Sequence, residues 1–137
     1  VQNPEYESLA LRQLGDLDRW EGCLQDAASR YEAALALARE HEIVPAEALA
    51  LSGLALVLAE RGEFADAEAT LERVDSLSRD HWDRLTSALV LAARAEIAWL
   101  AGRMEGARAA LLEARALGIT GAEDELARVD ARMSGDR

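Results

Sequence analysis

The sequence predicts an all-α protein made of three consecutive helical hairpins and one final helix. Three glycines, Gly22, Gly62 and Gly102, stand forty residues apart, and the residues that follow them repeat in step. A fixed period of this length is typical of stacked structural units. Only two prolines occur, and no segment alternates apolar and polar side chains as a strand would. The positions that repeat are Leu24, Phe64 and Met104, then Ala27, Ala67 and Ala107, then Tyr31, Leu71 and Leu111, and then Leu37, Leu77 and Leu117.

The first hairpin is expected to begin at Asn3 and Pro4, because asparagine suits the cap position and proline suits the first helical position. The helix continues to about Glu21. Gly22 is then expected just past the helix end, in the left-handed conformation that glycine adopts most easily. The second helix, from about Leu24 to His41, carries an apolar stripe that must pack on a partner helix. The stripe consists of Leu24, Ala27, Tyr31, Ala34 and Leu35.

The second and third hairpins follow the same plan. Trp82 directly precedes the third hairpin and is expected to staple its start hydrophobically. The expected helices run from about Pro45 to Arg61, Phe64 to Arg79, Asp83 to Ala101, and Met104 to Leu117.

The last segment departs from the repeat. Gly118 and Ile119 resemble a helix stop, and Thr120 to Glu123 has the spacing of a capping box. The helix that follows carries one narrow apolar stripe, as expected of an element that covers the open end of a stack. The sequence therefore predicts a single domain, 1–137, with units at about 5–42, 45–81 and 83–117 and a capping helix at 121–134.

Composition and charge argue against several classes of function for this chain. The formal net charge of −11 argues against nucleic acid, whose phosphates require clustered cations. No run is long and apolar enough for a membrane helix, and the chain does not start like a secretory signal, so a cytoplasmic location is expected. All 15 cationic residues are arginine, which together with many Ala and Leu residues suggests a GC-rich bacterial genome. The first helix is apolar on more than one face and no initiator Met is present, so we expect a piece of a longer protein.

The repeat resembles the tetratricopeptide family over residues 5 to 117. The sequence pattern of that family has Leu-Gly in the first helix, a glycine at the turn, and then large apolar residues and alanines on the second helix. The matching residues are Leu14, Gly15, Gly22, Leu24, Ala27, Tyr31 and Ala34 in unit one, Leu54, Ala55, Gly62, Phe64, Ala67, Leu71 and Val74 in unit two, and Gly102, Met104, Ala107, Leu111 and Ala114 in unit three.

The resemblance implies a right-handed α-solenoid of three helix-turn-helix hairpins. The forty-residue period exceeds the family's usual length of about 34 and is similar to the long-period variety of bacterial signalling ATPases and transcription regulators. Two residues depart from the pattern: Asp18 stands where the family prefers an aromatic residue, and Arg94 stands where units one and two carry Leu14 and Leu54. HEAT-type helical repeats, which have a similar period, are the structural alternative.

The resemblance also implies a binding groove lined by the first helix of each hairpin. Trp99 is a candidate anchor for a bound peptide, with Trp20 near the same edge. The chain has no Lys, so a clamp for a peptide carboxylate is not supported, and an amphipathic helix or an extended segment with an Arg or acidic residue fits better. The candidate groove residues are Arg12, Asp16, Arg19, Trp20, Ser52, Leu56, Ala59, Ala92, Glu96 and Trp99.

The residues that could carry catalytic chemistry are interpreted as structural residues. His41 and His81 occupy the same repeat position and are expected at hairpin corners, and Cys23 is expected to be a half-buried packing thiol. We therefore expect no enzymatic activity, no metal and no cofactor. The acidic residues of the second unit are interpreted as a solvated face; they are Glu60, Glu63, Asp66, Glu68 and Glu72.

Two function classes remain open. The first is a scaffold that binds another protein or a peptide within a larger bacterial regulatory or signalling protein. The alternative is a sensor domain of a transcription regulator, whose groove holds a small effector. Self-association is also expected through the first helix, whose outer face no capping element covers. If the groove is not the contact surface, the partner is expected on that same helix around Tyr6 and Leu9.

Overall fold

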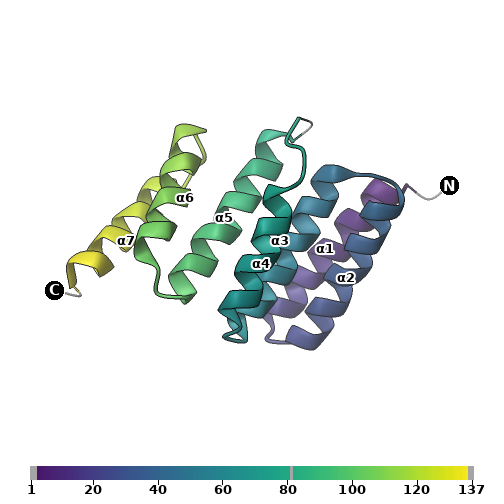
Figure 1. The fold of residues 1–137 in the computed structure, drawn as a ribbon, viewed down its shortest axis with the longest axis horizontal. Helices are drawn as coiled ribbons and strands as arrows, with labels where there is room; N and C mark the ends of the chain where they lie inside the picture. The colour runs from purple at the N-terminus through teal and green to yellow at the C-terminus, as the bar shows by residue number, and fades with distance from the viewer. Residues whose placement is uncertain (1–2, 81, 136–137) are drawn as a thin grey trace.

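The computed structural model describes residues 3–80 and 82–135 as an all-α protein with seven helices and, in these residues, no strand. Consecutive helices pack as hairpins, α1 with α2, α3 with α4 and α5 with α6, while α3 also contacts α1 and α5. Figure 1 shows the first hairpin at one end of the molecule and α7 at the other. The helices are α1 (Pro4–Trp20), α2 (Leu24–Glu40), α3 (Val44–Glu60), α4 (Phe64–Asp75), α5 (Arg84–Leu100), α6 (Met104–Ala116) and α7 (Ala122–Gly135).

The three glycine turns have the predicted conformation. Gly22, Gly62 and Gly102 have φ values of 81°, 82° and 76°. After each glycine the next backbone N–H bonds back to a carbonyl five residues earlier, at 2.7 Å in the first turn, 2.9 Å in the second and 2.8 Å in the third. This bond satisfies a carbonyl at the end of the preceding helix, as in a Schellman motif. The repeat in the sequence is therefore a repeat of one turn geometry.

The cap at the start of the chain is also confirmed. The Asn3 side-chain oxygen accepts hydrogen bonds from the backbone N–H groups of Glu5, at 2.9 Å, and Tyr6, at 3.4 Å. Pro4 is the first residue of α1 and has no N–H that would need a partner.

The core of the first two hairpins is organised around Tyr31, whose side chain is fully buried. Two helical glycines leave room for its ring, Gly15 from α1 and Gly53 from α3. A methyl group added at Gly15 would lie 2.8 Å from ring atom Cε1, and one at Gly53 would lie 2.7 Å from Cζ and closer still to two other ring carbons. Because carbon atoms normally stay about 3.5 Å apart or more, no larger residue fits here without moving the ring.

The fourth helix is shorter than predicted and ends at Asp75, not Arg79. The Ser76 hydroxyl donates to the Arg73 carbonyl at 2.7 Å, and the Ser78 hydroxyl accepts from the Asp80 N–H at 3.3 Å. Such local side-chain bonds compete with the helical ones.

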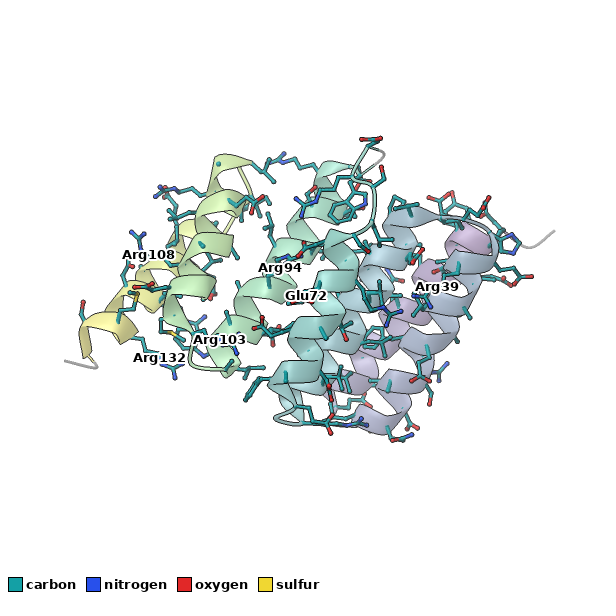
Figure 2. All side chains as sticks on the ribbon, viewed as in Figure 1. Arg39, Glu72, Arg94, Arg103, Arg108 and Arg132 are labelled. Carbon is teal, nitrogen blue, oxygen red and sulfur yellow. The ribbon has the colours of Figure 1, made fainter. Side chains whose placement is uncertain are left out.

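Arg94 of α5 acts at the same end of α4. Its guanidinium bonds the Asp75 carboxylate and reaches the Leu71 carbonyl oxygen at 3.5 Å. Figure 2 labels Arg94. The arginine that departs from the leucine pattern of the first two units therefore holds α5 against the end of α4.

The seventh helix is present as predicted, but the capping box is not. A capping box would need Thr120 directly before the first helical residue. The helix begins at Ala122, so the residue directly before it is Gly121, with φ 90°. Ala122, Leu126 and Val129 are buried with α6 residues in one cluster, and Arg108 of α6 bonds Asp130 of α7 at 2.9 Å.

Two further expectations concern Trp82 and membrane insertion. Trp82 packs against the cluster that contains Leu51, Val74 and Val90, next to the Asp83 cap of α5. A hydrophobic staple would need an apolar fourth residue in α5, and that residue is Ser87, so Trp82 is partly buried by this cluster and not by a staple. Among the described helices, none combines the length and apolarity that crossing a bilayer requires.

Candidate binding surface

The first helices of the three hairpins are joined by one arginine. Arg19 of α1 has a side chain that is only 8% exposed, and its Nη1 lies 2.8 Å from Glu60 Oε1 of α3 and 3.7 Å from Glu96 Oε1 of α5. Burial disfavours the charged guanidinium, but the hydrogen bond to Glu60 and the nearby Tyr31 and Glu96 outweigh it, so the pKa of Arg19 is raised. We call this surface the first-helix face and define it by Arg12, Asp16, Arg19, Glu60, Glu96 and Trp99.

The α1 part of this face is fixed from below by Tyr31. The Tyr31 hydroxyl donates to one oxygen of Asp16, whose other oxygen accepts from Arg12 Nη1 at 3.2 Å. Burial, and then the Asp16 carboxylate, raise the pKa of Tyr31 far above its usual range, so the phenol stays protonated and remains a donor. Arg12 and Asp16 are thereby held as a rigid edge of the face.

A cavity of about 500 Å³ opens next to this face, between α5, α6 and α7. Its wall from α5 consists of Ala92, Ala95, Glu96, Trp99 and Leu100, and α7 contributes Glu125, Arg128 and Val129. A volume of this size falls within the range of sites that hold a small ligand or a few peptide side chains.

The Trp99 ring already carries cations from the same chain. The guanidinium carbon of Arg132 lies 4.5 Å from the ring centroid and that of Arg128 lies 5.7 Å from it. Figure 2 shows Arg132 on α7, at the end of the molecule. Both distances are within the range of favourable cation–π contacts, so this indole has an environment that suits guanidinium groups.

Glu96 is the carboxylate of this region that the neighbouring arginines engage least, since Arg19 lies 3.7 Å from it and 2.8 Å from Glu60. The Glu96 side chain is 48% exposed. Burial raises the pKa of Glu96, and Glu60 and Glu125 raise it further against the opposing effect of Arg19. Because Arg19 is already bonded to Glu60 and Arg128 to Glu125, at 2.8 Å each, Glu96 is the carboxylate best placed to accept an additional cation.

The structure places the candidate groove residues in four groups. Ala92, Glu96 and Trp99 line the cavity, and Arg12, Asp16 and Arg19 form ion pairs on the α1 side. Trp20, the last residue of α1, is 69% exposed. The α3 positions Ser52, Leu56 and Ala59 are buried, with 3%, 7% and 3% exposure, so they offer a partner little surface.

Glu60 of this surface, and Arg128 and Arg132 beside its Trp99, were not among the candidate groove residues. Glu60 was interpreted as part of a solvated acidic face, yet it bonds the buried Arg19. It directly follows Ala59, the repeat equivalent of Arg19 and Trp99, which was the available signal. Arg128 and Arg132 were not identified from the sequence, because only the packing of α7 brings them onto Trp99.

The remaining candidates give no chemical centre. Cys23 is exposed rather than half-buried, because it lies at the tip of a tight turn before α2, and His41 ends α2 as an exposed corner residue. The prediction for His81 falls outside the described residues. Within 3–80 and 82–135, no three His, Cys, Asp or Glu side chains are grouped closely enough to hold a metal ion. No family model and no curated protein sequence matches this chain.

Proposed function

We propose that this chain is a tetratricopeptide-type interaction scaffold, a right-handed α-solenoid that binds a segment of another protein on its first-helix face. The observation that carries the proposal is the Arg19 bridge, which joins α1, α3 and α5 into one surface beside the Trp99 cavity. A surface that extends over three helices and ends in an aromatic pocket suits a peptide better than it suits a single small group. The setting we propose is a larger bacterial regulatory or signalling protein.

The chemistry of the pocket indicates a partner segment with an arginine or lysine. The cation would lie on the Trp99 ring, where Arg128 and Arg132 now lie, and would be neutralised by Glu96. Apolar neighbours of that cation would contact Ala92, Leu100 and Leu111, which line the same cavity. The acidic balance of the whole chain, −11, adds a favourable long-range attraction for a basic segment.

A small-effector sensor is the second candidate, and the cavity itself favours it. At about 500 Å³ the cavity can hold a small molecule, and the same Trp99 and Glu96 would select a cationic one. L-arginine and spermidine are suitable probes. A saturable rise in melting temperature with either compound would favour the sensor.

The scaffold is tested by selecting binders from a random-peptide display library against the wild-type protein. We expect enrichment of peptides with Arg or Lys beside an apolar residue. The Trp99→Ala variant should bind the selected peptides more weakly by about 2 kcal/mol or more, as truncation of an aromatic anchor does.

Leu117→Ala provides the matched control, because Leu117 is 45% exposed and does not line the cavity. Binding to this variant should stay within a few tenths of a kcal/mol of wild type, as for surface changes outside a site. Selected peptides that bind wild type, Trp99→Ala and Glu96→Gln equally well would place the contact surface elsewhere.

A further inference from the structure

The outer side of α1 carries an apolar stripe that no part of the described chain covers. Tyr6, Leu17 and Trp20 are 70%, 50% and 69% exposed, and Ala10 and Gln13, between them, are exposed as well. The five residues follow one another at intervals of four, three, four and three, the spacing of a helix seam that packs on another helix. Figure 1 shows α1 and α2 at the end of the molecule, opposite α7.

The stripe reads almost the same from both ends. Gln13 is at its centre, Ala10 and Leu17 lie on either side, and Tyr6 and Trp20 lie at the two ends. If two copies of α1 are placed antiparallel about Gln13, then Ala10 of each copy faces Leu17 of the other, and Tyr6 faces Trp20. A small residue thus meets a large one, an aromatic meets an aromatic, and the amide meets an amide.

We propose that α1 forms a two-fold, antiparallel interface with α1 of a second copy of this chain. The occupant follows from this self-complementarity, since a two-fold contact brings the same patch together from both copies. The stripe also borders an apolar hollow between α1 and α2, of about 620 Å³ and lined in part by Leu14, Ala33 and Leu37. The second copy covers Leu14 there, which lies next to the two-fold axis.

The rim of this interface is acidic and sets its salt dependence. Glu7 and Glu21 lie on the same side of the stripe, near its two ends, so that Glu7 of one copy comes close to Glu21 of the other. Since screening weakens repulsion between exposed charges, association becomes tighter as the ionic strength rises. An interface held by rim ion pairs would show the opposite dependence.

Cross-linking tests the geometry, in a Cys23→Ser background that removes the single native thiol. In the antiparallel pair, two cysteines introduced at Gln13 lie opposite each other, about 8 to 10 Å apart at the helix axes. Two cysteines introduced at Tyr6 lie about 21 Å apart along the helix. A short bismaleimide should therefore link Gln13→Cys chains into dimers and leave Tyr6→Cys chains unlinked. Equal linking of both variants would indicate a parallel contact and overturn the proposal.

Sedimentation equilibrium tests the association itself. We expect a concentration-dependent dimer for the wild type, at least tenfold weaker association for Leu17→Glu, and wild-type behaviour for Leu117→Glu, another exposed leucine that lies outside the stripe. Far-UV circular dichroism verifies that each variant is folded, and the cross-linking result is independent of Leu17→Glu. A wild type that stays monomeric at all concentrations, or a Leu17→Glu variant that dimerises equally well, overturns the proposal.

Discussion

Replacing Gly53 by alanine tests the packing around Tyr31. The added methyl group would lie 2.7 Å from Tyr31 Cζ and nearer to two other ring carbons, so the ring would have to move by about 1 Å to restore ordinary contact distances. Its hydroxyl is bonded to Asp16 and its side chain is fully buried. Overpacking of this kind costs about 1 to 3 kcal/mol, against a gain of about 0.8 to 1 kcal/mol from the better helix propensity of alanine. Subtracting this gain from the cost leaves an expected net loss of up to about 2 kcal/mol.

Gly106→Ala is the matched control for this prediction. Gly106 is also helical, but a methyl group there would meet its nearest neighbour at 3.6 Å, an ordinary contact. This variant should gain up to about 1 kcal/mol, because only the propensity difference acts. Since both are Gly→Ala changes in helices, the difference between them isolates the Tyr31 ring.

Urea unfolding followed by circular dichroism measures both variants. In a Tyr31→Leu background, which reproduces the residue of the other two units, Gly53→Ala should lose most of its cost, with a coupling energy of about 1 to 2 kcal/mol. If Gly53→Ala stabilised the protein as much as Gly106→Ala does, the ring would not occupy this slot and the packing described for the first two hairpins would be wrong.

Three further predictions follow from burial, backbone conformation and charge. Ala67 is fully buried between helices while Ala65 is exposed, so Ala67→Leu should cost about 1 to 3 kcal/mol and Ala65→Leu little; equal urea midpoints would contradict this. Glu42 has φ 54°, a conformation that disfavours side chains, so Glu42→Gly should stabilise by about 0.5 to 1 kcal/mol, and a loss of stability would refute the strain. Because the folded-state pKa of Glu96 is raised, its ionisation lowers stability as the pH rises from 4.5 towards neutrality. Glu96→Gln should therefore have a higher melting temperature than wild type at pH 7, and this difference in melting temperature should vanish at low pH. A difference that grows on acidification would contradict a raised pKa of Glu96.

The hairpin plan was predictable because each turn depends on one local requirement. Gly22, Gly62 and Gly102 supply a left-handed residue at the same register, and a left-handed glycine leaves a recognisable mark in a sequence. The end of α4 was not predictable in the same way. Ser76 and Ser78 use their hydroxyls to replace helical bonds, and the carboxylate of Asp75 is held by Arg94, nineteen residues further along the chain.

The surface was only partly predictable, because register fixes which side of a helix a residue occupies but not what covers it. Arg19, Glu96 and Trp99 were identified by register, and the structure brings Arg19 and Glu96 within 3.7 Å. The same register also selected Ser52 and Leu56. These residues are buried because their helix, α3, lies between α1 and α5. Contacts between distant charges, such as Arg19 with Glu60, require the actual separations of the helices.

The indole N–H signals of the three tryptophans test the central claim most directly. Trp99 lines the cavity, Trp20 lies on the outer stripe of α1 and Trp82 packs before α5, so each reports on a different surface in a heteronuclear NMR spectrum. During titration with a selected arginine-containing peptide, we predict a saturable shift of the Trp99 signal that is weakened by Glu96→Gln, while the Trp82 signal stays in place. A shift of the Trp20 signal alone, with Trp99 unchanged, would show that the partner binds outside the first-helix face and would contradict the proposed function.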